Sequence, residues 1–287
     1  MGVRIVQHDY GKARVRVLKV RRRGDVHDVR ELTVQVLAEG DFAETYVTGD
    51  NRRVLPTDTI KNTVYALARK ESVDRIETFA LALADHFLAR HAPIQRVRVE
   101  IVERAWARIT TRQGEHRLPH PHSFVAAGAE SWVATVVRDR DALPVRHSGF
   151  DGLRVMKTTG SGFEGYARDE WTTLPETKDR ILATEVVARW LWGDAPPADF
   201  AAANSAIRDA MLEVFANEYS PSVQNTLLLM GQAALDRCAQ VREIRLSMPN
   251  LHANRVDLAP LGLDNPNEIF VPTDEPHGLI EATLARE

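Results

Sequence analysis

The chain has 287 residues, with 37 Lys and Arg against 40 Asp and Glu, so its formal net charge is −3. This length fits one large domain or two average ones, and 44% hydrophobic residues supply the core. The near-neutral charge argues against nonspecific binding to nucleic acid, whose phosphates require a basic face. The single cysteine excludes an intramolecular disulfide, and with it a disulfide-stapled secreted scaffold.

The hydropathy and the ends of the chain predict a cytoplasmic protein. No apolar run approaches the roughly 18 residues of a membrane helix. Residues 1–10 lack the apolar core of a signal peptide, and residues 285–287 are not a peroxisomal signal. We therefore expect neither a membrane nor a nucleic acid among the partners of this protein.

The first half of the chain predicts two strands, two helices and two further strands. Residues 14–17 and 32–36 alternate polar and apolar side chains, which is the period of a sheet with one buried face. Pro56 ends this pattern, and apolar residues then recur at helical spacing in two successive segments. Strand alternation returns at 96–101 and again at 131–138.

The second half repeats this order in pattern but with little sequence identity. Strands are predicted at 153–157 and 243–248. Three helical stretches are predicted between them, at 179–192, 199–218 and 223–237.

Helices grouped between paired strands indicate an α+β fold, with antiparallel sheets and helices on one face. A doubly wound parallel sheet is disfavoured, because strands and helices do not alternate singly and no GxGxxG motif follows a strand. We place the boundary between the halves so that residues 1–139 and 140–287 form two domains.

Three neighbouring histidines, His116, His120 and His122, are candidates for a metal site. Imidazoles one residue apart on an extended chain point to the same side, so two of them could share an ion. The prolines beside them indicate a loop, however, and no Cys or acidic cluster completes a ligand set, so we predict no metal. Cys238 lies in an apolar helical segment, which is typical of a buried small hydrophobe.

Two prolines precede predicted helix starts that carry polar residues. Thr57 and Asp58 follow Pro56, and Gln224 lies shortly after Pro221. A helix N-terminus presents unpaired N–H groups and a partial positive charge, which suit a planar anion or an oxyanion. The side chain of Gln224 adds both a donor and an acceptor.

Four further polar residues lie at turns or at the ends of predicted elements. Asn250 and His252 follow Pro249 on a short loop at the end of a strand. Lys12 directly precedes the first strand, and Arg180 opens the first helix of the second half. Each also fits a structural role, as a turn residue or a solvated charge, and spacing alone does not tell whether they converge.

Five segments of the chain together resemble the urate oxidase (uricase) family. They occur in the family's order, span nearly the whole chain, and include the specific run TDTIKNT. The segments are YGKARVR (10–16), LPTDTIKNT (55–63), SGF (161–163), SVQNTL (222–227) and MPNLH (248–252). The run HPHSF at 120–124 is also similar to the family, which weakens the case for a metal there.

The resemblance implies two tandem tunnelling-fold (T-fold) domains, each an antiparallel sheet with helices on one face. It also implies a homotetramer whose sheets surround a tunnel, with active sites at subunit interfaces. The implied reaction is the oxidation of urate by O2 and water to 5-hydroxyisourate and hydrogen peroxide, a step of purine degradation. Neither a metal nor an organic cofactor is implied.

The resemblance also implies a role for each candidate residue in binding urate. Arg180 would bind the urate anion, Gln224 would pair with the pyrimidine edge, and Phe163 would stack on the ring. The backbone N–H group of Val223 would meet a further ring heteroatom. The other two N–H donors would be those of Thr57 and Asp58.

Protons and O2 would be handled by a second set of residues that the resemblance identifies. Lys12, Thr57 and His252 would form a proton relay, in which the lysine holds the threonine hydroxyl ready to pass protons. Asn250 and the Thr57 hydroxyl would hold O2, then peroxide or water, above the ring.

Two other hypotheses stay open. A tunnelling-fold enzyme acting on a pterin or another purine heterocycle, in some cases with zinc, would share the fold. The lone cysteine in an apolar helix and the lack of a compact His set on one strand weigh against it. A catalytically inactive scaffold assembled through its sheets is the second hypothesis, and the intact set of candidate residues argues against it.

Overall fold

The computed structural model describes residues 3–286. In this range the chain divides into two compact units, residues 3–150 with 194–196 and residues 151–193 with 197–286. The predicted domain boundary at 139/140 lies at the end of the fourth strand, shortly before this division, and stays a prediction.

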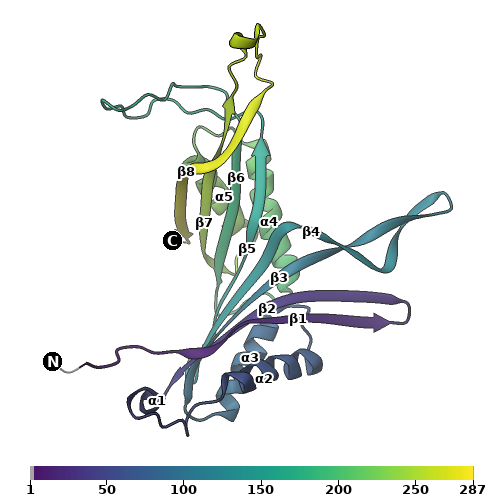
Figure 1. Cartoon of the computed structure of the whole chain (residues 1–287), viewed down its shortest axis with the longest axis vertical. Helices are drawn as coiled ribbons and strands as arrows, with labels where there is room; N and C mark the ends of the chain where they lie inside the picture. Colours follow the sequence, from purple (N-terminus) through teal and green to yellow (C-terminus); the bar gives the residue numbers. More distant parts are fainter. Residues whose placement is uncertain (1–2, 287) are drawn as a thin grey trace. The chain divides into compact units, whose positions relative to one another are not determined.

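The first unit is an antiparallel sheet with helices on one face (Figure 1). Its strands pair in chain order, β1-β2-β3-β4. Alternate residues of the second strand, including Leu32, Val34 and Val36, share one core with Phe79 and Leu83 of the third helix. The elements are β1 (Tyr10–Arg23), β2 (Val26–Gly40), α1 (Ala43–Val47), α2 (Thr57–Lys70), α3 (Ile76–Arg90), β3 (Ile94–Gln113) and β4 (His116–Asp139).

The second unit has the same design. Strand β5 (Val145–Lys157) runs across the division between the units and pairs with β6, and the order continues β6-β7-β8. Helix α5 contacts β7 and β8, and α4 packs against α5. The remaining elements are β6 (Leu182–Trp192), α4 (Phe200–Asn217), α5 (Val223–Arg237), β7 (Val241–Arg255), the short 3-10 helix η1 (Ala259–Leu261) and β8 (Phe270–Ala285).

The predicted helix at 179–192 is wrong, because most of this segment forms strand β6. Burial alternates along β6 from Leu182 to Trp192, with every second side chain in the core. β-Branched and aromatic residues such as Val186 and Trp190 favour a strand, and their period of two decides the structure. With β6 in place, each unit reads two strands, two long helices and two strands, and the α+β prediction is confirmed.

The duplication is closest in the second long helix and the strand that follows it. Helices α3 and α5 both have 15 residues, and each leads into its strand, β3 or β7, through a connection of equal length. The strands then bury their first residues in the same order. Counted from the helix starts, Glu77 corresponds to Gln224 and Glu103 to Asn250.

An arginine closes the C-terminal end of each of these helices in the same way. Nη2 of Arg140 donates to four carbonyl oxygens at or after the end of α3, including that of His91 at 3.1 Å. Arg286 binds three of the corresponding carbonyls at the end of α5, including that of Cys238 at 3.1 Å. Several of these carbonyls also accept a backbone N–H, as that of His91 does from Ile94 and that of Cys238 from Val241, so each arginine adds a second, charged donor at the helix end.

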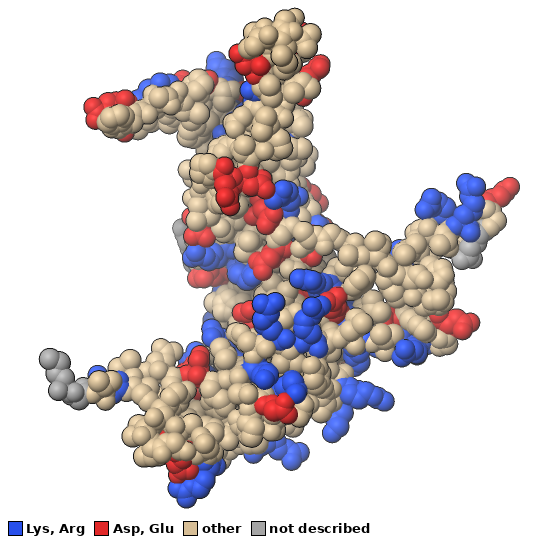
Figure 2. All heavy atoms as spheres, viewed as in Figure 1, with Lys and Arg blue, Asp and Glu red and all other residues tan. Residues whose placement is uncertain are grey.

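Both signs of charge are spread over the surface. Figure 2 shows Lys and Arg interspersed with Asp and Glu on the visible face, as the near-neutral net charge leads one to expect. No helix within residues 3–286 combines the length and the apolar character that a membrane crossing needs.

Candidate functional site

The predicted site residues fall into two groups, one in each unit. The first unit carries Lys12, Thr57 and Asp58. The second unit carries Phe163, Arg180, Val223, Gln224, Asn250 and His252.

In the first unit, Lys12 lies inside β1, opposite Val36 of β2, and not before the strand as predicted. Gly11 approaches β2 so closely that a Cβ would lie 1.8 Å from the carbonyl oxygen of Val36. The ladder is interrupted directly after Lys12, and Arg14 there has a φ of 57°. Such a bulge re-aims the neighbouring side chains, so the backbone around Lys12 departs from a regular strand.

The loop before α2 is tied to β1. The hydroxyl of Tyr10 accepts a hydrogen bond of 2.7 Å from the backbone N–H of Leu55. Pro56 occupies the N-cap position of α2 and offers no side-chain acceptor. The first N–H groups of the helix, those of Thr57 and Asp58, are therefore not capped by the residue that precedes them, and both residues are exposed.

The carboxylate of Asp58 is held within its own helix. It accepts hydrogen bonds from the ammonium of Lys61 and, at 3.0 Å, from the side-chain amide of Asn62. Its pKa is lowered, first by the hydrogen bond and charge of Lys61 and to a smaller extent by the charge of Lys12. Lys12 therefore lies within electrostatic reach of the start of α2.

In the second unit, Phe163 and Arg180 lie against each other. The guanidinium carbon of Arg180 is 5.5 Å from the centroid of the Phe163 ring. Phe163 is held by two backbone hydrogen bonds to Thr177, of 2.7 and 3.1 Å. Burial lowers the pKa of Arg180, and the phenol of Tyr219 opposes that shift, but a guanidinium remains protonated. Arg180 thus provides a fixed, partly buried positive charge beside an aromatic face.

The same segment is joined to the start of α5 through buried hydroxyl residues. The N–H of Gly162 donates to the carbonyl of Ser220 at 2.8 Å, and the N–H of Arg180 donates to that of Ser161 at 2.8 Å. The hydroxyl of Thr226, in the first turn of α5, donates to that of Ser220 at 2.6 Å. Ser161, Ser220 and Thr226 are all buried, so these contacts hold Phe163 and Arg180 close to the N-terminus of α5.

Helix α5 keeps part of its N-terminus available. Ser222 is the N-cap, and its hydroxyl accepts a hydrogen bond of 3.1 Å from the N–H of Asn225. The N–H of Val223 lies outside that cap, and the side chain of Gln224 is exposed. The N–H donor of Val223 and the partial positive charge of the α5 N-terminus therefore lie near the Arg180–Phe163 pair. An anionic ring bound there would require such a donor and charge.

Three predictions about local structure at these residues are wrong. Arg180 does not open a helix but precedes strand β6, because the helix predicted there does not exist. Asn250 and His252 lie within β7 and not on a loop, because β7 continues past Pro249 to Arg255. Pro249 is accommodated in the strand, opposite Leu279 of β8.

Asn250 sits between two neighbours in the sheet. It pairs with Thr184 of β6 on one side and with Gly278 of β8 on the other. The pairing with β8 shifts between Asn250 and His252, and His252 is exposed.

Gln224 and Asn250 have counterparts in the duplicated helix and strand of the first unit. Their counterparts in the first unit are Glu77 and Glu103, both buried. Burial raises the pKa of Glu103 and outweighs the charge and hydrogen bond of Arg30, which lower it. The charge of Glu77 raises this pKa further. Gln224 and Asn250 hold in the second unit the positions in helix and strand that these two carboxylates hold in the first.

Sequence reasoning missed Ser220, Thr226 and Tyr219, although they organise the second group. The sequence feature that could have indicated Ser220 is the run Ser220-Pro221-Ser222, because hydroxyl side chains beside a proline are typical of a helix start. Pairing Ser220 with Ser161 requires knowledge of the fold, because the two are far apart in the chain.

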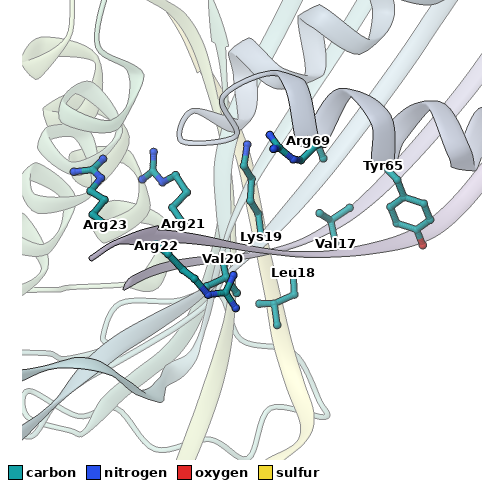
Figure 3. A pocket seen from close by; sticks show the side chains of 10 residues that line it. Val17, Leu18, Lys19, Val20, Arg21, Arg22, Arg23, Tyr65 and Arg69 are labelled. Atoms are coloured by element: carbon teal, nitrogen blue, oxygen red, sulfur yellow. The ribbon is translucent and has the colours of Figure 1, made fainter. Parts of the chain in front are cut away.

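A hollow of about 820 Å³ lies between β1 and α2 (Figure 3). It is lined by Lys19, three arginines at 21–23, Tyr65 and Arg69, and by none of the predicted site residues. Arg21 there is paired with Asp74. The arginine run is thus partly engaged in ion pairs and does not mark the site.

The histidine segment forms a ring cluster. The rings of His120 and His122 lie 4.6 Å apart, and that of His27 lies 5.7 Å from His122. In the part of the chain that the structure describes, no group of three or more His, Cys, Asp or Glu residues could hold a metal ion.

Comparison with known proteins identifies the family. The family model for uricase matches residues 8–137 and 146–281. The chain is 39% identical to the uricase of Oryctolagus cuniculus over 290 residues, covering 99% of this chain and 95% of that protein. It is 42% identical to the uricase of Dictyostelium discoideum over 284 residues, covering 98% and 97%.

A solved structure agrees with this match. The crystal structure of uricase from Arthrobacter globiformis superposes with a TM-score of 0.93 and 40% identity, covering 100% of this chain and 96% of that one. The match covers the residues of both units, and it confirms the tunnelling fold that the resemblance implied. The chain belongs to the uricase family.

Proposed function

We propose that this chain catalyses the oxidation of urate by O2 and water to 5-hydroxyisourate and hydrogen peroxide, in purine degradation. One observation carries the proposal: the charged Arg180 lies against Phe163 beside the start of α5. The chain that holds this arrangement is 39% to 42% identical to uricases over nearly its whole length.

A flat anion fits the group of residues in the second unit. Its ring stacks on Phe163, while the planar guanidinium of Arg180 donates two parallel hydrogen bonds. The N–H of Val223 supplies a further donor at the positive end of α5. Gln224 offers both a donor and an acceptor to the pyrimidine edge, which distinguishes urate from an apolar ring of the same size.

The first unit supplies most of the proton relay. Lys12, close to the start of α2, holds the hydroxyl of Thr57 ready to pass protons, and the exposed His252 extends the relay to solvent. Asn250 and the Thr57 hydroxyl hold O2 above the ring. The N–H groups of Thr57 and Asp58 complete the set of ring contacts.

Urate itself supplies the electrons in this reaction. Its doubly deprotonated form is electron-rich and gives two electrons, one at a time, to O2, which leaves as hydrogen peroxide after taking up two protons. Water then adds to the oxidised ring and yields 5-hydroxyisourate. The protein stabilises the dianion through Arg180, Lys12 and the helix N-termini and holds the two reactants together, so we propose that no cofactor takes part.

We further propose a homotetramer with active sites at subunit interfaces, as the family resemblance implies. Such a site combines the first unit of one copy with the second unit of another, and a closed symmetric assembly repeats it in every copy. Localisation in the cytoplasm stays a prediction from the sequence.

The test is to add urate to purified, chelator-treated protein and to follow urate absorbance together with O2 uptake. We expect urate and O2 to be consumed in equal amounts while hydrogen peroxide forms. Protein that leaves urate unchanged would contradict the proposal. Activity that depends on stoichiometric zinc would instead favour the tunnelling-fold enzyme of another heterocycle.

A further inference from the structure

Thr184 of β6 is buried without a hydrogen-bond partner. Its exposed fraction is 0%, and its hydroxyl oxygen finds no partner among the residues described. Buried side-chain hydroxyls are almost always hydrogen-bonded, so an exception calls for a physical account. The neighbouring core positions of β6, such as Val186, carry apolar side chains.

The position of Thr184 in the sheet points to Asn250. The two are direct partners across the antiparallel pair β6 and β7. Direct partners project from the same face of the sheet, with Cβ atoms roughly 4.5–5.5 Å apart. On the other side Asn250 is flanked by Gly278, where even an added Cβ would stay 3.9 Å from that of Asn250. The hydroxyl of Thr184 is thus the side-chain hydrogen-bonding group next to Asn250 along the ladder.

The duplicated first unit serves as an internal comparison. There the residue that corresponds to Asn250 is Glu103, and its direct partner across the ladder is Leu32. Leu32 is also fully buried. The fold therefore accepts a leucine at this place, and packing alone does not require the hydroxyl that the second unit carries.

We infer that Thr184 is a positioning residue for the oxygen site, an inference that rests on the proposed function. The structure contains no hydrogen bond between these two side chains; the proposed bond forms when Asn250 turns to hold O2, with the hydroxyl of Thr184 donating to Oδ1 of Asn250. This bond satisfies the buried hydroxyl and turns the Nδ2 donors of Asn250 toward O2 and the peroxide that replaces it. Because an amide can flip with little steric change, a single hydrogen bond decides which of its two ends faces the site.

Isosteric substitutions test this inference in the full-length protein. Thr184→Val removes the hydroxyl but keeps the shape, and we expect it to lower kcat/KM for O2 about fivefold, the rate equivalent of one hydrogen bond. The affinity for urate, measured without O2, stays unchanged. Thr184→Ser restores the rate. Val186→Thr is the matched control, because it makes the reverse exchange two residues away on the same buried face and leaves kcat/KM for O2 unchanged.

Two outcomes would overturn the role of Thr184. One is a Thr184→Val protein with the kcat/KM for O2 of the unsubstituted chain. The other is an equal loss in the Val and Ser variants together with weaker urate binding, which would indicate a general structural defect. Failure of the proposed function is distinguishable, because then the unsubstituted chain itself consumes no urate.

Discussion

Lys12 shows how much of the chemistry depends on one side chain. It lies on β1 directly before a bulge, and its charge acts on Asp58 at the start of α2. The neutral amine of a lysine in this place can accept a proton through Thr57, and the ammonium that forms favours the urate dianion. Proton transfer through Lys12 affects the rate, whereas the binding of urate depends mainly on groups of the second unit.

We therefore expect Lys12→Met to lower turnover at least about tenfold while urate binding stays nearly intact, since a positioned acid or base is typically worth ~10² or more in rate. Turnover from initial rates and urate affinity measured without O2 check this. Lys19→Met is the control, because Lys19 lies on the same strand and its ammonium donates to the carbonyl of Glu71, at 2.7 Å, away from the start of α2. A Lys12→Met protein with unchanged turnover would remove Lys12 from the relay.

The identity of the site residues could be predicted from sequence motifs, but their support could not. Arg180, Phe163 and Val223 stand in short recognisable runs. The contacts that bring them together pass through Ser161 and Ser220, which are 59 residues apart and join only through a backbone bridge. A pairing of this kind depends on the path of the chain, and no local pattern encodes it.

At the scale of elements, the arginines after β4 and β8 close the ends of α3 and α5. Both arginines make partly buried hydrogen bonds to carbonyls. The side chain of Arg140 is half-buried, whereas that of Arg286 is exposed to solvent. A hydrogen bond from a charged donor contributes about 1.5–3 kcal/mol. Each arginine should therefore stabilise the last turn of its own helix, and Arg140 more strongly.

We expect Arg140→Met to lower hydrogen-exchange protection at the end of α3 about tenfold, which corresponds to ~1.4 kcal/mol, and to leave the end of α5 unchanged. Arg286→Met should have the converse and smaller effect. Peptide-resolved exchange measures both, and each variant is the control for the other. A uniform loss of protection over the whole chain in either variant would show that the arginine stabilises more than its helix end.

The order of elements followed from periodicity with one error, and the error has a clear cause. The segment at β6 carries Ala, Leu, Glu and Arg, which favour helices, between its Val and Trp residues. Its alternation becomes decisive only when one face is buried, as the structure shows for Leu182 to Trp192. The error also misplaced Arg180 at a helix start, whereas its role in binding urate stays a prediction from the resemblance.

At the scale of the molecule, the two groups of site residues belong to different units, and the proposed site joins units of different copies. This arrangement predicts complementation between inactive variants. Lys12→Met with Thr57→Ala disables only the first unit, and Arg180→Gln disables only the second. A pair formed from one copy of each variant then has one interface site with all the substitutions and one site with none.

Hybrids of the two variants should therefore regain activity that neither variant has alone. With random pairing, half of the pairs are mixed and half of their sites are intact, so we expect about a quarter of the unsubstituted activity. Copies carrying two different affinity tags allow the mixed assemblies to be isolated, which confirms that subunits have exchanged. If isolated hybrids stay as inactive as their parents, each site is built from one copy of the chain, and the assembly serves stability alone.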